Sequence, residues 1–404
     1  MTQPPPESAL PKGFRFAATA CGLKKTGALD LALISSDVPA SAAAVFTQNL
    51  VVAAPVTLCK KNLRESKGHM RAVVVNAGNA NCATGVHGEI VAQRTNEEAA
   101  RRMLIAPQEL FVCSTGVIGV QLPVEKILRA LPSLSRNRRP SARSFAELSL
   151  AICTTDTRPK TASASFKMSG KRIHLVGCAK GAGMIHPNMA TTLAFVVTDA
   201  AISPSLLQRT LRDIASRTFN SISVDGDTST NDTLLVLANG AADAASIAGG
   251  SKAHRHFAAA MEEVCGSLAR QIVADGEGAQ RVLEIEVRGA KTESAARKVA
   301  ETIATSPLVK TAFAGGDPNW GRIFAAAGRS GVKFDPSLVE ITMAGIKVLR
   351  KGQPLAFNER AASNRLLVEH VPIVVDLHAG KSRARYWTCD FTAEYVRINA
   401  SYRT

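Results

Sequence analysis

The chain has 404 residues, 46% of them hydrophobic, which is enough to bury a sizeable core in two or three lobes. Its net charge is +16, but the one dense basic stretch (Arg136, Arg138, Arg139 and Arg143) has no interleaved aromatic residues. We therefore expect a solvated loop there rather than a nucleic-acid site, and a positive field that attracts small carboxylate substrates.

The ends, the apolar runs and the cysteines predict a cytoplasmic protein. The first eleven residues contain four prolines and lack the charged start and apolar run of a signal peptide. No apolar run approaches the roughly 20 residues of a membrane span, so we expect no membrane partner. The eight cysteines are dispersed without a C-x-x-C pair, which predicts reduced core thiols and excludes the usual zinc and redox spacings. We also expect no bound cofactor.

Short β-rich runs alternate with segments of helical periodicity, as is typical of an α/β fold. Strands are predicted over 72–75, 193–198, 233–238, 282–287 and 372–377. A helix should begin after Ser203, which would cap it, with Leu207, Leu211 and Ile214 on its buried face.

Two further helices and one further strand are predicted from composition. Helices are expected over 257–272 and over 295–305, the latter too rich in Ala, Lys and Glu to be wholly buried. Residues 383–390 alternate charged with aromatic or apolar side chains, which predicts an edge or half-exposed strand.

The stretch from Lys180 to Phe195 has an unusual composition. Two glycines permit a sharp backbone path, a proline stiffens the approach, and Ala190-Thr191 then leads directly into an apolar strand. This layout suits an N-to-O acyl shift, in which the Thr191 hydroxyl attacks the Ala190 carbonyl and water hydrolyses the ester. On spacing alone, a loop rich in Gly and Pro before a buried strand is the better explanation of the stretch.

A cut at this bond would create its own catalytic base. The new α-amine of Thr191 would have an unperturbed pKa of roughly 7.7 to 8, so it could accept the proton of its own hydroxyl near neutral pH. No histidine is needed, and none of the eight histidines forms a plausible Ser-His-Asp signature.

The string from Lys180 to Thr191 closely resembles the processing site of the ornithine acetyltransferase family, the bifunctional glutamate N-acetyltransferases of arginine biosynthesis. Further blocks occur in the family's order across nearly the whole chain. They begin at Asp37, Val45, Val75, Ser114, Thr154, Ser223, Gly315 and Val396.

The resemblance implies a self-processing enzyme of the N-terminal-nucleophile type, α/β with mixed sheets flanked by helices. Residues 1–190 would form an alpha chain and 191–404 a beta chain, assembled as two alpha and two beta chains. Thr191 would accept acetyl from N2-acetylornithine, release ornithine and pass the acetyl to glutamate in a ping-pong sequence. Acetyl-CoA would be a second acetyl donor if the enzyme is bifunctional.

The resemblance also assigns site residues. The Thr115 hydroxyl and the Gly116 N–H would form the oxyanion hole, although Ser-Thr-Gly alone is an ordinary strand-end turn. Thr191 is both nucleophile and substrate contact, and the choice between Thr154 and Thr155 stays open. The expected substrate-binding residues are Thr154, Lys180, Thr191, Glu277, Asn399 and Thr404.

Lys180 suits a substrate carboxylate and Glu277 an ammonium, although both would ordinarily be solvated loop residues. Thr404 could contribute only if the C-terminal tail is tied down. Ala182 stands where the family commonly has Ser, and Thr192 where Met is frequent, so the rate of maturation and the register of the cut are in question.

The acidic loop from Asp225 to Asp232 partly mimics a calcium loop but has Thr230 and Val236 where such a loop needs Gly and Glu. We predict no metal, and we expect the loop's hydroxyls and carboxylates to fix turns around the site.

Two other functions stay open. The same nucleophile could belong to an amidase or aminopeptidase that releases acetate. A basic binding protein would instead stay a single uncut chain.

Overall fold

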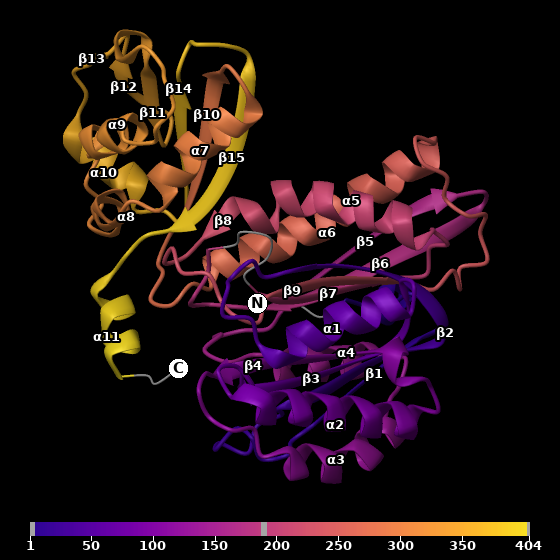
Figure 1. The fold of residues 1–404 in the computed structure, drawn as a ribbon. Helices are drawn as coiled ribbons and strands as arrows, with labels where there is room; N and C mark the ends of the chain where they lie inside the picture. Colours follow the sequence, from indigo (N-terminus) through magenta and orange to yellow (C-terminus); the bar gives the residue numbers. More distant parts are fainter. Residues whose placement is uncertain (1–4, 187–191, 402–404) are drawn as a thin grey trace.

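The fold is a mixed α/β arrangement with two sheets, described by a computed structural model for residues 5–186 and 192–401 (Figure 1). The larger sheet has the order β4-β3-β2-β9-β7-β6-β5, with β1 paired to β2. It contains parallel pairs (β3 with β4, β7 with β9) and antiparallel ones. Its strands are β1 (Phe14–Thr19), β2 (Leu31–Phe46), β3 (His69–Asn79), β4 (Leu110–Val117), β5 (Lys160–Met168), β6 (Lys171–Lys180), β7 (Leu193–Thr198) and β9 (Thr233–Ala238).

Strand β2 joins two parts of the larger sheet. Its pairing register with β3 shifts between Ser35 and Ala40, and beyond the shift its second half pairs with β9. One apolar core therefore lies between strands of the two parts, for example between Phe16 and Phe195. The outer faces are covered by α5 and α6 on one side and by α2 and α3 on the other. The helices are α1 (Ala54–Glu65), α2 (Gly85–Met103), α3 (Val124–Arg136), α4 (Ala142–Ala151), α5 (Pro204–Arg217) and α6 (Lys252–Ala274).

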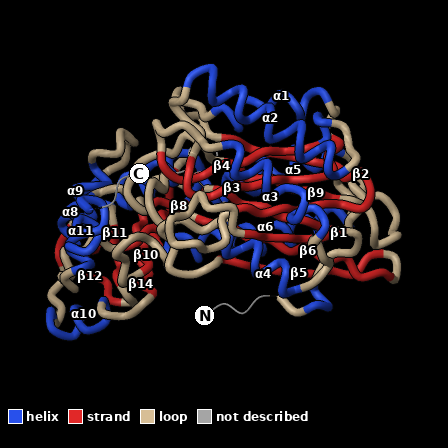
Figure 2. Tube along the Cα trace, turned by 90° about the horizontal axis from the view of Figure 1, so that it is seen from below, coloured by secondary structure: helices blue, strands red, loops and turns tan. Residues whose placement is uncertain are grey.

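The second sheet belongs to a smaller lobe, seen beside one end of the larger sheet in Figure 2. Its order is β13-β12-β11-β14-β10-β15-β8. The strands are β8 (Ile222–Ser223), β10 (Val282–Ala290), β11 (Glu340–Met343), β12 (Ile346–Arg350), β13 (Gln353–Pro354), β14 (His370–Asp376) and β15 (Ser382–Cys389). The accompanying helices are α7 (Glu293–Ala304), α8 (Pro307–Ala314), α9 (Trp320–Gly328), α10 (Glu359–Leu366) and α11 (Ala393–Ser401). Short 3₁₀ turns occupy Glu7–Ala9, Pro107–Glu109, Phe219–Ser221 and Pro336–Leu338.

The predicted strands over 193–198 and 233–238 are confirmed as β7 and β9, and the other predicted strands fall in β3, β10 and β14. Helix α5 begins as predicted, because the Ser203 side chain accepts from the Leu206 N–H and Pro204 is the first helical residue. The alternation in β15 is confirmed, since Arg383 and Arg385 are exposed while Tyr386 is buried.

The edge position predicted for β15 is correct only in part. This strand pairs with β10 along its length, whereas β8 covers its other side only at Trp387 and Thr388. The expected alpha and beta chains do not correspond to the two lobes, because β7 and β9 lie between β2 and β6 in one sheet. In the part of the chain that the structure describes, no helix has the length and apolar character needed to cross a bilayer.

Candidate active site

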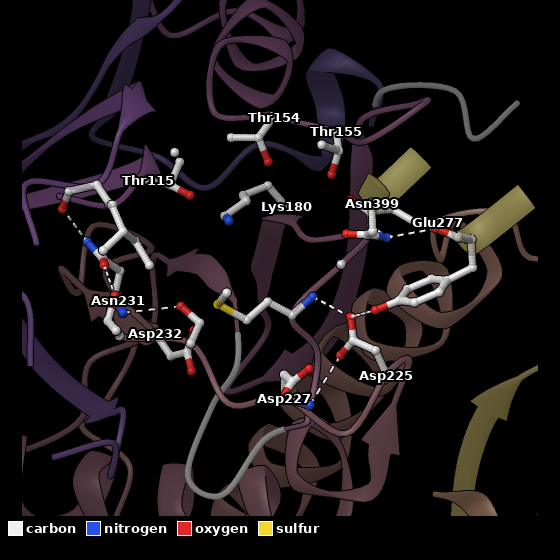
Figure 3. Close-up of a pocket in the computed structure, with 18 residues that line it drawn as sticks. Thr115, Thr154, Thr155, Lys180, Asp225, Asp227, Asn231, Asp232, Glu277 and Asn399 are labelled. Atoms are coloured by element: carbon white, nitrogen blue, oxygen red, sulfur yellow. Dashed lines mark hydrogen bonds between the residues drawn. The ribbon is translucent and has the colours of Figure 1, made fainter. Parts of the chain in front are cut away.

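A pocket of about 140 Å³ lies where the end of β4, the end of β6, the loop before β9 and α11 meet (Figure 3). That volume is below the roughly 300 to 1,000 Å³ of pockets for drug-sized ligands, so it suits a small metabolite. The pocket brings together six of the residues predicted from the sequence: Thr115, Gly116, Thr154, Lys180, Glu277 and Asn399. Three other predicted positions, Ala190, Thr191 and Thr404, lie outside the described residues.

Only glycine fits at position 116, near the end of β4. Its φ is +130°, and a Cβ there would come within 2.4 Å of the Gly78 carbonyl carbon on the neighbouring strand. The two backbones approach closely where the register of their pairing shifts, and the Thr115 side chain lines the pocket. A hydroxyl and a backbone N–H at such a strand end are the donors that a tetrahedral oxyanion needs.

Buried asparagines hold this end of β4 in place. Asn231 donates through Nδ2 to the Ala80 carbonyl at 2.6 Å and to the Ser114 carbonyl at 2.9 Å. The Ser114 hydroxyl donates to Asn76 Oδ1 at 2.6 Å, and Asn76 donates to the Asn79 carbonyl at 2.9 Å. Because a buried amide without partners is costly, this network fixes the geometry of the end of β4.

Asn231 also links the end of β4 to the strand that follows the expected cut. It lies two residues before Thr233, whose N–H donates to the Thr192 carbonyl at 2.8 Å. From there β7 and β9 run parallel, with Leu193 opposite Thr233. The loop before β9 therefore contacts both the strand end at Ser114 and the strand that begins after Thr192.

A buried ionic cluster supports the loop that carries Thr154. Lys160, whose side chain is fully buried, donates to Asp156 Oδ1 and to Asp275 Oδ2, each at 2.5 Å. Asp156 also accepts from the N–H groups of Gly181 at 2.7 Å and Thr154 at 2.9 Å. Burial would raise the pKa of Asp156, but the charges of Lys160 and Lys180 outweigh it and lower that pKa.

Lys180 ends β6 and points into the pocket (Figure 3). Burial lowers the pKa of its ammonium, and the nearby Asp156 and Asp232 carboxyls partly oppose that effect. Burial likewise raises the pKa of Asp232 well above its usual value, although Ser229 and Lys180 act in the opposite direction. The pocket thus holds a lysine and a carboxylic acid whose charges depend on one another.

The opposite side of the pocket is acidic. The Glu277 carboxyl lies against Gly183, where a Cβ would come within 2.5 Å of its carboxyl carbon. Glu277 Oε2 accepts from Asn399 Nδ2 at 2.8 Å. Asp225 accepts from the N–H groups of Met184 and Ile185 at 2.6 and 2.8 Å, so it fixes the loop that leads to the expected cut.

Helix α11 is tied down at its start. The Thr392 hydroxyl donates to the Gly278 carbonyl at 2.7 Å. Gly278 has a φ of +70°, and a Cβ there would come within 2.5 Å of the Tyr395 nitrogen. Tyr395 then reaches Asp225 at 3.4 Å, which brings the C-terminal segment to the pocket.

Three pocket residues (Asn231, Asp232 and Tyr395) and Asp156, which supports the Thr154 loop beside the pocket, were not predicted individually. The only sign of them in the sequence was that they lie in polar segments, such as the acidic loop that ends directly before a buried strand. Thr154 and Thr155 both line the pocket, so the choice between them stays open. Within residues 5–186 and 192–401, no group of three or more His, Cys, Asp or Glu side chains is placed to hold a metal ion.

The whole chain is similar to proteins of one family. It is 49% identical to the arginine biosynthesis bifunctional protein ArgJ of Thermus thermophilus, over 98% of this chain and 99% of that protein. It is 46% identical to the protein of the same name from Symbiobacterium thermophilum, over 98% of each chain.

A crystal structure of the arginine biosynthesis bifunctional protein ArgJ from Bacillus halodurans has 43% identity and a TM-score of 0.51, covering 52% of this chain and 98% of that chain. The ArgJ family model matches residues 15–404. The chain therefore belongs to the ArgJ family.

Proposed function

We propose that the protein is the acetyltransferase of arginine biosynthesis that moves acetyl from N2-acetylornithine to glutamate, and that it also acetylates glutamate from acetyl-CoA. Membership of a family whose relatives are named as bifunctional proteins of arginine biosynthesis supports this function. The observation that carries the proposal is the convergence of oxyanion donors, a lysine and a glutamate on one small pocket.

Each of these groups has a role in the proposed reaction. The Thr115 hydroxyl and Gly116 N–H would stabilise the tetrahedral intermediates of both half-reactions. Lys180 would bind a substrate carboxylate, and Glu277, held by Asn399, would bind an ammonium. Thr154 and Thr404 would complete the contacts, and no resident cofactor is needed for acyl transfer to a threonine.

We further propose that the chain cuts itself between Ala190 and Thr191. The half-length chain of the B. halodurans crystal structure supports this, since residues 191–404 make up about half of this chain. The burial of Thr192, with its carbonyl bonded to Thr233, supports Thr191 rather than Thr192 as the nucleophile.

The assembly and location of the enzyme are proposals of the same kind. Two alpha and two beta chains would form the active particle, as the family resemblance implies. Strands from both sides of the cut share one sheet, which supports one alpha chain staying bound to one beta chain. A cytoplasmic location fits eight cysteines that are all unpaired.

Intact-mass analysis tests the cut directly. The wild-type protein should give two fragments of similar size, the larger beginning at Thr191, and Thr191→Ala should remain whole and inactive. With N-acetylornithine and glutamate, the wild type should form N-acetylglutamate. Free acetate in its place would identify an amidase, and a fully active uncut chain would exclude the proposed mechanism.

A further inference from the structure

Asp232 is a buried carboxyl group that the proposed mechanism leaves without a role. It is 2% exposed, lines the pocket, and sits beside Asn231 on the side that carries Thr115 (Figure 3). Among the described residues, no donor lies within hydrogen-bond distance of its Oδ2. Asp156, by contrast, accepts from an ammonium and two backbone N–H groups.

Burial, rather than a neighbouring charge, favours the neutral form of Asp232. Asp156 and Asp275 already balance the buried Lys160 and the nearby Lys180. An additional carboxylate with one oxygen that lacks a donor would leave a poorly compensated buried charge, which is costly. Lys180 is close enough to favour the ionised form in part. Asp232 therefore binds a proton more readily than an exposed aspartate does, and Lys180 still favours its release.

The acetyl-transfer cycle, if the proposed function holds, needs a place to keep one proton. When the threonine ester forms, the amide C–N bond breaks and the hydroxyl proton ends on the departing nitrogen, which leaves ornithine as a neutral amine. This amine must gain a proton to become the ammonium that is stable in water. Glutamate arrives as an ammonium and must lose a proton before its nitrogen can attack the ester.

We propose that Asp232 stores this proton between the two half-reactions. Its carboxylic acid protonates the departing α-amine of ornithine and becomes a carboxylate. It then accepts the proton of the glutamate α-ammonium, whose freed lone pair attacks the ester carbonyl as the C–O bond to the threonine breaks. The threonine oxygen regains a proton from the attacking nitrogen, so the enzyme returns to its starting state.

The position of Asp232 fits this role. It directly precedes Thr233, the residue bonded to Thr192, so it lies beside the strand that follows the proposed nucleophile. Lys180 would stabilise the transient carboxylate. Other titratable groups of the pocket lining could compete for the proton: Asp225, Asp227, Glu277 and Tyr395. The α-amine that the proposed cut would create on Thr191 is a further competitor.

The test compares two acceptors on the acetylated enzyme. Glutamate must lose a proton before it attacks, whereas hydroxylamine is largely unprotonated at neutral pH and needs no base for this step. Wild type and Asp232→Asn, each first shown by mass to be cut into two fragments, are acetylated with N-acetylornithine. Loss of the acetyl group from the threonine is then followed by mass after quenching.

We expect Asp232→Asn to lose about a hundredfold or more in the rate of transfer to glutamate, the usual size of a general acid–base contribution. Transfer to hydroxylamine should stay within about threefold of wild type. An equal loss with both acceptors would show that Asp232 has a structural role only. No loss with glutamate would mean that another group accepts the glutamate proton. Either result overturns the proposal.

The wild-type enzyme provides a second measurement if Asp232→Asn does not mature. Its rate of transfer to glutamate should rise with pH through an ionisation that is missing with hydroxylamine, because Asp232 must be a carboxylate to accept the proton. Identical pH profiles for the two acceptors would refute the storage role. Failure of the wild type to form an acetyl-enzyme would instead refute the proposed function.

Discussion

Two groups of residues, in the pocket lining and directly supporting it, meet the cost of buried polar groups in opposite ways. The oxyanion wall, which we define as Thr115, Gly116 and the asparagines Asn76 and Asn231, contains no charge, and its amides bond to backbone carbonyls and to Ser114. The lysine wall, which we define as Lys180 and Asp232 of the lining together with the supporting Asp156, carries charges that shift one another's pKa.

The difference separates two tasks of a transferase. Donors that stabilise an oxyanion work best when fixed in advance, and a neutral network keeps them fixed at every pH. Substrates whose charge changes between bound and reacting forms need groups that can change charge with them. Changes to the oxyanion wall should therefore lower turnover without changing its pH dependence, whereas changes to the lysine wall should change affinity or the pH dependence of turnover.

The largest effect is expected at Thr115. Replacement by Ala removes one oxyanion donor from the end of β4, which Gly116 and Asn231 hold in place. The kcat should therefore fall by about a hundredfold to a thousandfold. KM and the pH of maximal rate should stay close to wild type, because no charge is lost. Steady-state kinetics of transfer from N-acetylornithine to glutamate across pH would measure all three quantities.

The exposed helical residue Thr311 offers a matched control, since Thr311→Ala makes the same chemical change outside the pocket. Near-normal turnover in Thr115→Ala would remove this hydroxyl from the oxyanion role.

A smaller effect, on affinity, is expected at Lys180. Replacement by Met keeps much of the apolar stem but deletes the charge, and a hydrogen bond to a charged partner contributes about 1.5 to 3 kcal/mol. KM should therefore rise by roughly tenfold to a hundredfold, with a smaller change in kcat. Lys171→Met, at the half-exposed start of the same strand, is the control. An unchanged KM would mean that Lys180 binds no substrate carboxylate.

Local features of the fold could be predicted from the sequence. Apolar runs defined β7 and β9, and the Ser203-Pro204 pair defined the start of α5, because strand and cap signals depend on neighbouring residues. The site residues that the structure brings together were found through resemblance to a family rather than through spacing.

Contacts across long sequence separations could not be predicted. Asn231 meets Ser114 over 117 residues, and this contact depends on the pairing of β7 with β9 and of β3 with β4. Asp232 and Asp156 looked alike as acidic residues in polar loops. Only the three-dimensional structure shows that Asp156 accepts from an ammonium and two backbone N–H groups, whereas Oδ2 of Asp232 has no partner among the described residues.

The smallest effect concerns folding stability. The two walls should differ in whether a substitution changes how stability depends on pH. The pKa of Asp232 in the folded protein lies above its unfolded value of about 3.9. As pH rises from that value, the unfolded chain releases this proton while the folded protein retains it, so folding stability falls until the folded pKa is reached.

Asn cannot ionise, so Asp232→Asn should lack this loss. Its melting temperature relative to wild type should increase from pH 5 to pH 8, whereas the difference between Thr115→Ala and wild type should stay constant with pH. Thermal melts at the two pH values would measure both differences. A pH-independent difference for Asp232→Asn would mean that the folded protein holds Asp232 ionised throughout, and the contrast between a neutral and a titrating wall would then be lost.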